Sequence, residues 1–182
     1  SGTTITEGHN NVALGSDALY QVTTGDKNIA VGSQALDSLT DTNNMVAIGH
    51  NAGTAVNHAG AEGGTFVGYE AGKAVTSGGH NTALGYQALY TNSTASYNTA
   101  IGSQALGFAT GAGITAVGYR AMQQLTSGAG NTALGFEAGK LITTGHSNTF
   151  LGYECGQSFD GGESKMTAIG RDSMGSADNG SS

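Results

Sequence analysis

Apolar and polar residues follow one pattern that repeats about every 17 residues along this chain. Each copy contains an aliphatic residue followed directly by glycine, and we number positions within a copy from that glycine, as position 0. The ten glycines are Gly15, Gly32, Gly49, Gly68, Gly85, Gly102, Gly118, Gly135, Gly152 and Gly170, spaced by 16 to 19 residues. A fixed period over the whole chain predicts stacked, structurally equivalent units.

The residues at one position of successive copies form a column, and several columns are nearly uniform. Position −1 is always aliphatic, position −2 is Ala in eight copies and Phe in two, and position +3 is Ala in the first eight copies. Position −3 is aliphatic in the first three copies and Thr in the other seven. Thr and the other β-branched residues favour strands. Positions −4 to −1 therefore predict one short strand in each copy.

The glycine at position 0 then turns the chain, and a return segment such as residues 86–90 leads to polar turn residues. A unit of about 17 residues is too short for a helical hairpin, and parallel stacking at about 4.8 Å per unit predicts a rod about 48 Å long. We therefore expect an all-β fold, a parallel β-solenoid of ten ~17-residue coils over residues 8–174. Residues 1–7 form a lead-in and residues 175–182 a polar tail. For the return segment we favour an extended conformation over a helical turn.

The predicted strands are apolar on both faces, which indicates burial on both. Alternation places positions −1 and −3 on one face and position −2 on the other. We expect the −1 column to fill the coil and the −2 column to face outwards, where it needs a partner. The chain is then a symmetric oligomer. The candidate interface is the −2 column: Ala13, Ala30, Ala47, Phe66, Ala83, Ala100, Ala116, Ala133, Phe150 and Ala168.

Several copies carry a family resemblance. Residues 11–15 (NVALG), 28–32 (NIAVG) and 45–49 (MVAIG) resemble the head repeat of trimeric autotransporter adhesins, whereas residues 81–89 and 131–138 are more similar to repeats of bacteriophage tail fibres. The resemblance covers about residues 8–174. It implies a homotrimer of left-handed parallel β-rolls on a virion tail fibre or a bacterial cell surface. The period is longer here than in the adhesin heads, and Thr replaces the aliphatic residue at −3 in seven copies.

Composition and charge exclude two classes of partner. The chain has 32 Gly, no Pro and no Trp, and its net charge is −7 with only six Lys and Arg. Those six cations are scattered and form no basic patch, so we expect no nucleic acid partner. No apolar run approaches the roughly 20 residues of a membrane helix, so we expect no membrane insertion.

The sequence contains no set of unlike groups that would converge on a substrate, because its columns repeat the same residue types. We therefore expect no catalytic residue, no metal and no cofactor. The five histidines lie near turns without the spacing of metal ligands. Cys155 replaces Ala at +3 and is interpreted as a packed residue. Residues 160–163 (DGGE) lack the nonapeptide of calcium-binding rolls. The polar +2 column predicts a solvated edge, and Asn at −4 predicts hydrogen bonds along the stack.

Two departures from uniformity are suited to receptor contact. The first is an aromatic ladder at position +1, interrupted by Ser103, whose rings either bind sugar faces or only stack on one another. The second is a two-residue insertion within residues 57–63. The candidate receptor contacts are Tyr69, Tyr86, Tyr119, Phe136, Tyr153, His58 and Glu62.

The sequence thus predicts a non-enzymatic structural and receptor-binding segment of a phage tail fibre or bacterial surface adhesin. It would present a repetitive surface to host-cell glycans. The alternative is an ice-binding solenoid, in which Thr at −3 and the aliphatic residue at −1 form an exposed face and the Ala column packs inside a narrow coil. A polysaccharide-cleaving tailspike requires a convergent acidic site, for which the sequence shows no candidate.

Overall fold

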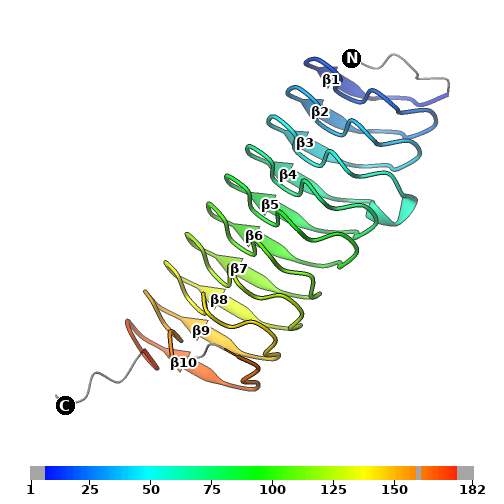
Figure 1. The fold of residues 1–182 in the computed structure, drawn as a ribbon. Helices are drawn as coiled ribbons and strands as arrows, with labels where there is room; N and C mark the ends of the chain where they lie inside the picture. The colour runs from blue at the N-terminus through cyan, green and yellow to red at the C-terminus, as the bar shows by residue number, and fades with distance from the viewer. Residues whose placement is uncertain (1–6, 159–160, 176–182) are drawn as a thin grey trace.

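The computed structural model describes residues 7–158 and 161–175, which form an elongated stack of coils (Figure 1). The strands are β1 (Val12–Leu14), β2 (Ile29–Val31), β3 (Val46–Ile48), β4 (Thr65–Val67), β5 (Thr82–Leu84), β6 (Thr99–Ile101), β7 (Thr115–Val117), β8 (Thr132–Leu134), β9 (Thr149–Leu151) and β10 (Thr167–Ile169), with a 3-10 turn, η1 (Ala59–Ala61), between β3 and β4. The predicted all-β solenoid with a repeat of about 17 residues is confirmed. Its left-handed sense stays a prediction, and the expected lead-in and tail lie largely outside the described residues.

All ten strands form one parallel sheet in the order of the sequence, from β1 to β10. Each residue pairs with the residue at the same position of the next coil, as Ala83 pairs with Ala100 between β5 and β6. The register therefore keeps every column intact along the rod. Side chains of one column stand next to one another on the same face, because a one-residue slip would move them to the other face.

The return segments are not strands, so the expected extended conformation is wrong. Each segment makes consecutive turns, closed by short-range bonds such as that from Ala88 N to Gly85 O at 3.4 Å. Residues at +2 and +4 adopt a positive φ, for example 50° at Gln87 and 54° at Leu89. This left-handed backbone bends the segment around the coil. Hydrogen bonds also join successive return segments, as from Leu89 N to Ala105 O at 3.0 Å.

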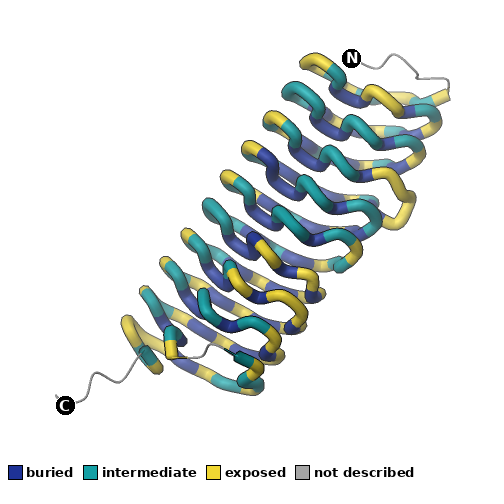
Figure 2. The backbone as a smooth tube through the Cα atoms, in the orientation of Figure 1, coloured by how far each residue is buried: buried dark blue, intermediate teal, exposed yellow. Residues whose placement is uncertain are grey.

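The two faces of the strands are the reverse of the expectation. The −2 column points into the coil of the single chain, where nine of its ten members are 2% exposed or less and Ala13 is partly buried. The buried positions recur at the same place in each coil (Figure 2). The −1 and −3 columns face outwards. The narrow coil explains the reversal, because the return segment already supplies larger core side chains such as Leu89 at +4 and Val75 at +7.

The candidate oligomer interface is therefore wrong, since its residues pack inside the protomer. The residues concerned are Ala13, Ala30, Ala47, Phe66, Ala83, Ala100, Ala116, Ala133, Phe150 and Ala168. An oligomer of this chain has to use another surface. The inward Ala column and outward Thr and aliphatic columns are the placement that the ice-binding alternative requires.

The two phenylalanines of the −2 column fit because neighbouring coils have glycine at +4. A Cβ added at Gly53 would lie 2.9 Å from Phe66, and Gly72 lies against the other side of the same ring. In the same way, a Cβ at Gly139 or Gly156 would lie 2.7 or 2.6 Å from Phe150. Coils with Ala at −2 mostly have Leu or Met at +4. The core thus conserves volume by exchanging large and small residues between the sheet and the return segment.

The Asn column at −4 links the coils, as predicted. Asn98 Oδ1 accepts from Ile114 N at 2.9 Å, and Asn98 Nδ2 donates to Gly111 O at 3.0 Å. Asn131 bonds in the same way to the backbone of Asn148 and Gly145, at 2.8 and 2.7 Å. Each buried amide therefore satisfies two backbone groups of the next coil that would otherwise lack partners.

Asn92 is the polar exception in the apolar +7 column. It is fully buried, and neither its Oδ1 nor its Nδ2 has a hydrogen-bond partner. Because an unsatisfied buried amide costs stability, Asn92→Val is expected to raise the free energy of unfolding by about 1–3 kcal/mol. Val is already the residue at this position at Val22 and Val75. Urea denaturation measures the change.

Asn131→Val is the matched control, since it removes an amide that does bond. It is expected to lower the free energy of unfolding by about 1–3 kcal/mol for the backbone groups it leaves unpaired. Equal losses in both variants would contradict the assignment of Asn92 as unsatisfied.

Candidate functional site

The outer surface of the ten-stranded sheet, formed by the −1 and −3 columns and called here the sheet face, carries an unbroken aliphatic column at −1 beside Thr or aliphatic residues at −3. Leu84 and Leu134 are 46% and 47% exposed, and Leu14 and Ile169 at the two ends are more exposed still. Monomeric proteins rarely expose a contiguous apolar patch beyond about 300–600 Å². A column of ten aliphatic side chains, flanked by Thr or aliphatic residues at −3, indicates a contact surface.

The aromatic ladder runs along the turns that follow the strands, and it divides into two stacks. Tyr69 and Tyr86 stack at a centroid distance of 5.3 Å, and Phe136 lies 5.1 Å from Tyr119 and 5.0 Å from Tyr153. The rings therefore stack on one another, and contact with sugar faces stays a prediction. All five remain exposed at their outer edges. Arg120 and Arg171 lie 4.9 and 5.2 Å from the ring centroids of Tyr119 and Tyr153, respectively.

The insertion around His58 and Glu62 forms η1 at the edge of the rod. His58 Nδ1 accepts from Gly60 N at 3.2 Å and caps this turn, while the side chain of Glu62 accepts from Asn43 Nδ2 of the preceding coil at 2.9 Å. His58 is exposed and Glu62 half-buried. Both candidate residues thus make structural contacts. Among the described residues, neither belongs to a cluster of reactive or metal-ligating side chains.

Most of the +2 column is half-buried and some members are ion-paired, and the predicted solvated edge is contradicted at Glu70. Glu70 is only 7% exposed and bonds to Lys73 Nζ at 2.6 Å and Gln87 Nε2 at 2.8 Å. The bond from Lys73, helped by Gln87, holds the pKa of the Glu70 carboxyl below its ordinary value. Glu137 accepts from Lys140 at 3.0 Å. The lowered pKa keeps the Glu70 carboxylate ionised, which is the opposite of what a general acid needs.

The described residues offer no other chemical centre. Cys155 is buried in the core, as predicted for a packed residue, and burial raises the pKa of its thiol, which disfavours a nucleophilic thiolate. In residues 7–158 and 161–175, no three His, Cys, Asp or Glu side chains gather where they could hold a metal. Over the same residues, no helix has the length and apolar character needed to cross a membrane.

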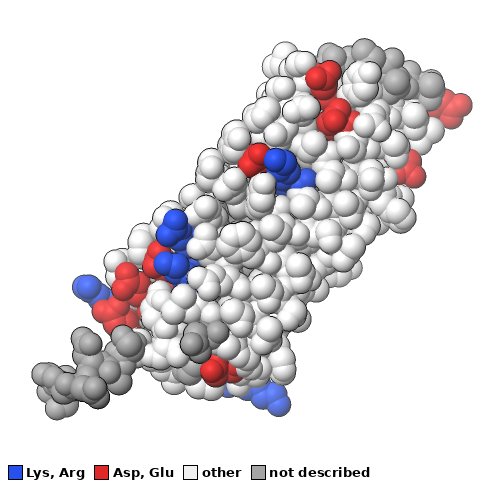
Figure 3. Space-filling model, viewed as in Figure 1, with Lys and Arg blue, Asp and Glu red and all other residues white. Residues whose placement is uncertain are grey.

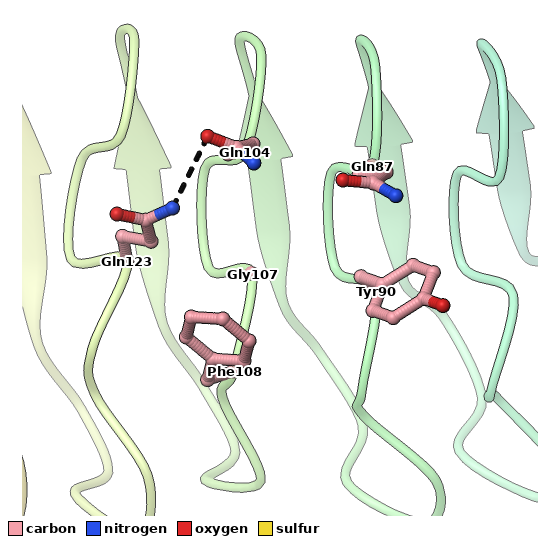
Figure 4. Close-up of a pocket in the computed structure, with 6 residues that line it drawn as sticks. All are labelled: Gln87, Tyr90, Gln104, Gly107, Phe108 and Gln123. Carbon is pink, nitrogen blue, oxygen red and sulfur yellow. Dashed lines mark hydrogen bonds between the residues drawn. The ribbon is translucent and has the colours of Figure 1, made fainter.

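A shallow hollow lies on the surface made by the return segments, called here the return face, between the fifth and sixth coils. It is open to solvent and is lined by Gln87, Tyr90, Gln104, Gly107, Phe108 and Gln123 (Figure 4). The sequence analysis missed this hollow. Its signal was the glycine at position +5 of the sixth coil, in a column that carries side chains in the other eight of the first nine coils.

No family model, curated protein or solved structure matches the chain. The geometry of the described residues therefore carries the functional argument.

Proposed function

We propose that the chain is a non-enzymatic, oligomeric fibre segment, as in a phage tail fibre or a bacterial surface adhesin, and that three copies pack through the sheet face. One observation supports this proposal above the others: an aliphatic column that faces outwards on all ten strands, exposed on six of them and half-buried on the other four. Burial of such a column against a second copy removes it from water, at about 25 cal/mol per Å² of apolar area. An oligomer is still proposed, although the −2 column is not its interface, because the outward-facing −1 column is itself aliphatic.

The mass in solution tests the assembly directly. A trimer of 18.0 kDa chains has a mass of about 54 kDa (3 × 18.0) by light scattering. The double variant Leu84→Glu, Leu134→Glu places charges in the packed sheet face, where symmetry brings like charges together. We expect this variant to fall to the mass of one chain while keeping the circular dichroism of a folded solenoid.

Gln124→Glu is the matched control, because Gln124 is exposed on the return face rather than on the sheet face. The control should keep the trimeric mass. A wild-type protein with a single-chain mass at micromolar concentration, or a double variant that stays trimeric, contradicts the proposed interface.

Receptor contact in this proposal falls on glycans and uses the exposed aromatic ladder. The apolar faces of sugar rings lie against aromatic rings, and repeated weak sites on three chains gain affinity because later contacts are intramolecular. Tyr119→Ala and Tyr153→Ala should weaken whole-cell binding without changing the melting temperature, and a shortened loop at residues 57–63 tests the insertion. If all three variants bind cells as strongly as the wild type, neither the ladder nor the insertion contacts the glycan.

A second candidate, ice binding, is favoured by one specific observation. Seven strands present Thr-x-aliphatic sequences outwards in a regular array, in register along the sheet. A free monomer with thermal hysteresis that is lost in Thr99→Lys and Thr132→Lys would establish this function in place of the fibre. The two candidates use the same sheet face, so an oligomer that covers it and an ice-binding surface exclude each other.

A further inference from the structure

The hollow on the return face exists because one residue lacks a side chain. Position +5 carries a side chain in eight of the first nine coils, and Gly107 is the exception. Its neighbours in this column are Tyr90 in the preceding coil and Gln123 in the next, and they form two sides of the gap (Figure 4). A Cβ at Gly107 would lie 3.3 Å from Gln104 O and 3.5 Å from Gln123 Cγ, so a side chain there fills the hollow with little strain.

Three glutamine amides line the hollow, and charged partners fix which way two of them point. Gln104 Oε1 accepts from Arg120 Nε at 2.9 Å and from Gln123 Nε2 at 3.2 Å. Gln87 Nε2 donates to a carboxylate oxygen of Glu70. Because a guanidinium only donates and a carboxylate only accepts, the oxygen and nitrogen of these amides are determined.

This network leaves one hydrogen-bonding group open on each of the three amides. Within the described residues, Gln104 Nε2 donates to no protein group, and Gln87 Oε1 and Gln123 Oε1 accept from none. Gln104 Nε2 and Gln87 Oε1 point toward the gap between their coils, whereas Gln123 Oε1 points away from it (Figure 4), so one donor and one acceptor remain for a ligand. A pair of vicinal hydroxyl groups, which both donate and accept, matches such a set.

Aromatic rings provide the apolar part of the hollow. Phe108 is 50% exposed and stands beside the amides. The ring of Tyr90 lies at the opposite end, with Lys73 Nζ 5.6 Å from its centroid. An exposed phenyl ring beside hydrogen-bonding amides suits a ligand with one apolar face and several hydroxyl groups.

The charges near the hollow are paired, so they favour a neutral ligand. Glu70 is bonded to Lys73 at 2.6 Å, and Arg120 lies 3.9 Å from Glu137. On the face of the rod in Figure 3, charged groups gather in small clusters and leave most of the surface uncharged. No unpaired cation among the lining residues would hold a carboxylate or a phosphate.

We infer that the hollow around Gly107 is a subsite for one neutral pyranose residue of a glycan. This inference rests on the proposed glycan contact of the fibre segment and adds a place separate from the aromatic ladder. The return face lies across the coil from the sheet face, so packing through the sheet face leaves the hollow open. Each copy in a trimer would present one such subsite.

Titration of the intact, side-chain-labelled oligomer with neutral methyl pyranosides tests the inference. The probes are the methyl glycosides of glucose, galactose, mannose and N-acetylglucosamine, each up to about 50 mM, because a single sugar contact is expected near the millimolar range. With ¹⁵N-labelled glutamine, the side-chain amide signals of Gln87, Gln104 and Gln123 should shift together and saturate with at least one probe. The absence of such shifts with all four probes overturns the inference.

Two variants fill or strip the hollow, and a third is the control. Gly107→Gln places a side chain at +5 and should weaken binding at least about tenfold, as should Phe108→Ala. Gln21→Ala changes an exposed residue of the return face in the first coil and should leave the titration unchanged. A titration that responds to Tyr153→Ala but not to Gly107→Gln places the sugar on the ladder, which refutes the subsite while the proposed function stands. A single-chain mass refutes the proposed function independently of the titration.

Discussion

Phe66→Ala is expected to lower the free energy of unfolding by about 3–5 kcal/mol, the range for removing a buried phenyl ring. The ring fills the space that Gly53 and Gly72 leave on its two sides. The next coil has alanine, Ala83, at the same position, and there Leu89 at +4 fills the space that the phenyl ring fills here. The loss should therefore come from a cavity rather than from any effect on the strand, and urea denaturation at fixed protein concentration measures it.

A second substitution separates this account from a general loss of apolar surface. Gly72→Leu alone should also destabilise, by about 1–3 kcal/mol, because its side chain collides with Phe66. In Phe66→Ala, Gly72→Leu the new side chain enters the cavity, so the double variant should be more stable than the sum of the singles by about 1–3 kcal/mol. Leu89 already has a φ of 54° at the equivalent position, so the backbone at Gly72 accepts leucine. Additive losses would refute the volume exchange.

Gly85→Ala is expected to disrupt the stack itself. The φ of Gly85 is 137°, which L-residues rarely adopt, and a Cβ there would lie 2.6 Å from the carbonyl oxygen of Gly102 in the next coil. Strain of about 1–3 kcal/mol and a clash of similar size add to a loss of about 2–6 kcal/mol. Thermal denaturation should show a lower melting temperature or no folded state.

Gly107→Ala is the control for this prediction, since its Cβ would meet neighbours only at 3.3 Å and beyond. It should change the free energy of unfolding by less than about 1 kcal/mol. If Gly85→Ala were as stable as Gly107→Ala, the close approach of successive coils at position 0 would be wrong.

The period of the sequence determined most of the fold in advance. Uniform columns at −1 and −3 located all ten strands and their register, and the recurrence of Asn at −4 identified the amides that join the coils. These inferences hold because stacking requires the same residue type at the same place in each coil. The aromatic rings at +1 stack for the same reason.

The direction in which the strands face could not be deduced from hydrophobicity, because the −1 and −2 columns are both apolar. Size was the better signal, since the −2 column is Ala in eight copies and Phe only beside glycines at +4, whereas the −1 column is uniformly larger than Ala. The turns of the return segment were missed because the left-handed residues include Gln87 and Leu89, which rarely adopt that conformation. The local sequence does not indicate these turns, because stacking of the coils outweighs the conformational preference of the individual residues.

The sequential order of the sheet also determines how this molecule can change size. Each strand bonds only to the strands one coil before and after it, so no contact ties the first coil to the last. Duplication or loss of one unit of about 17 residues would lengthen or shorten the rod by about 4.8 Å without altering any other junction. The length of such a molecule is therefore a whole number of coils, and duplication or deletion of single repeats in the gene changes it one coil at a time.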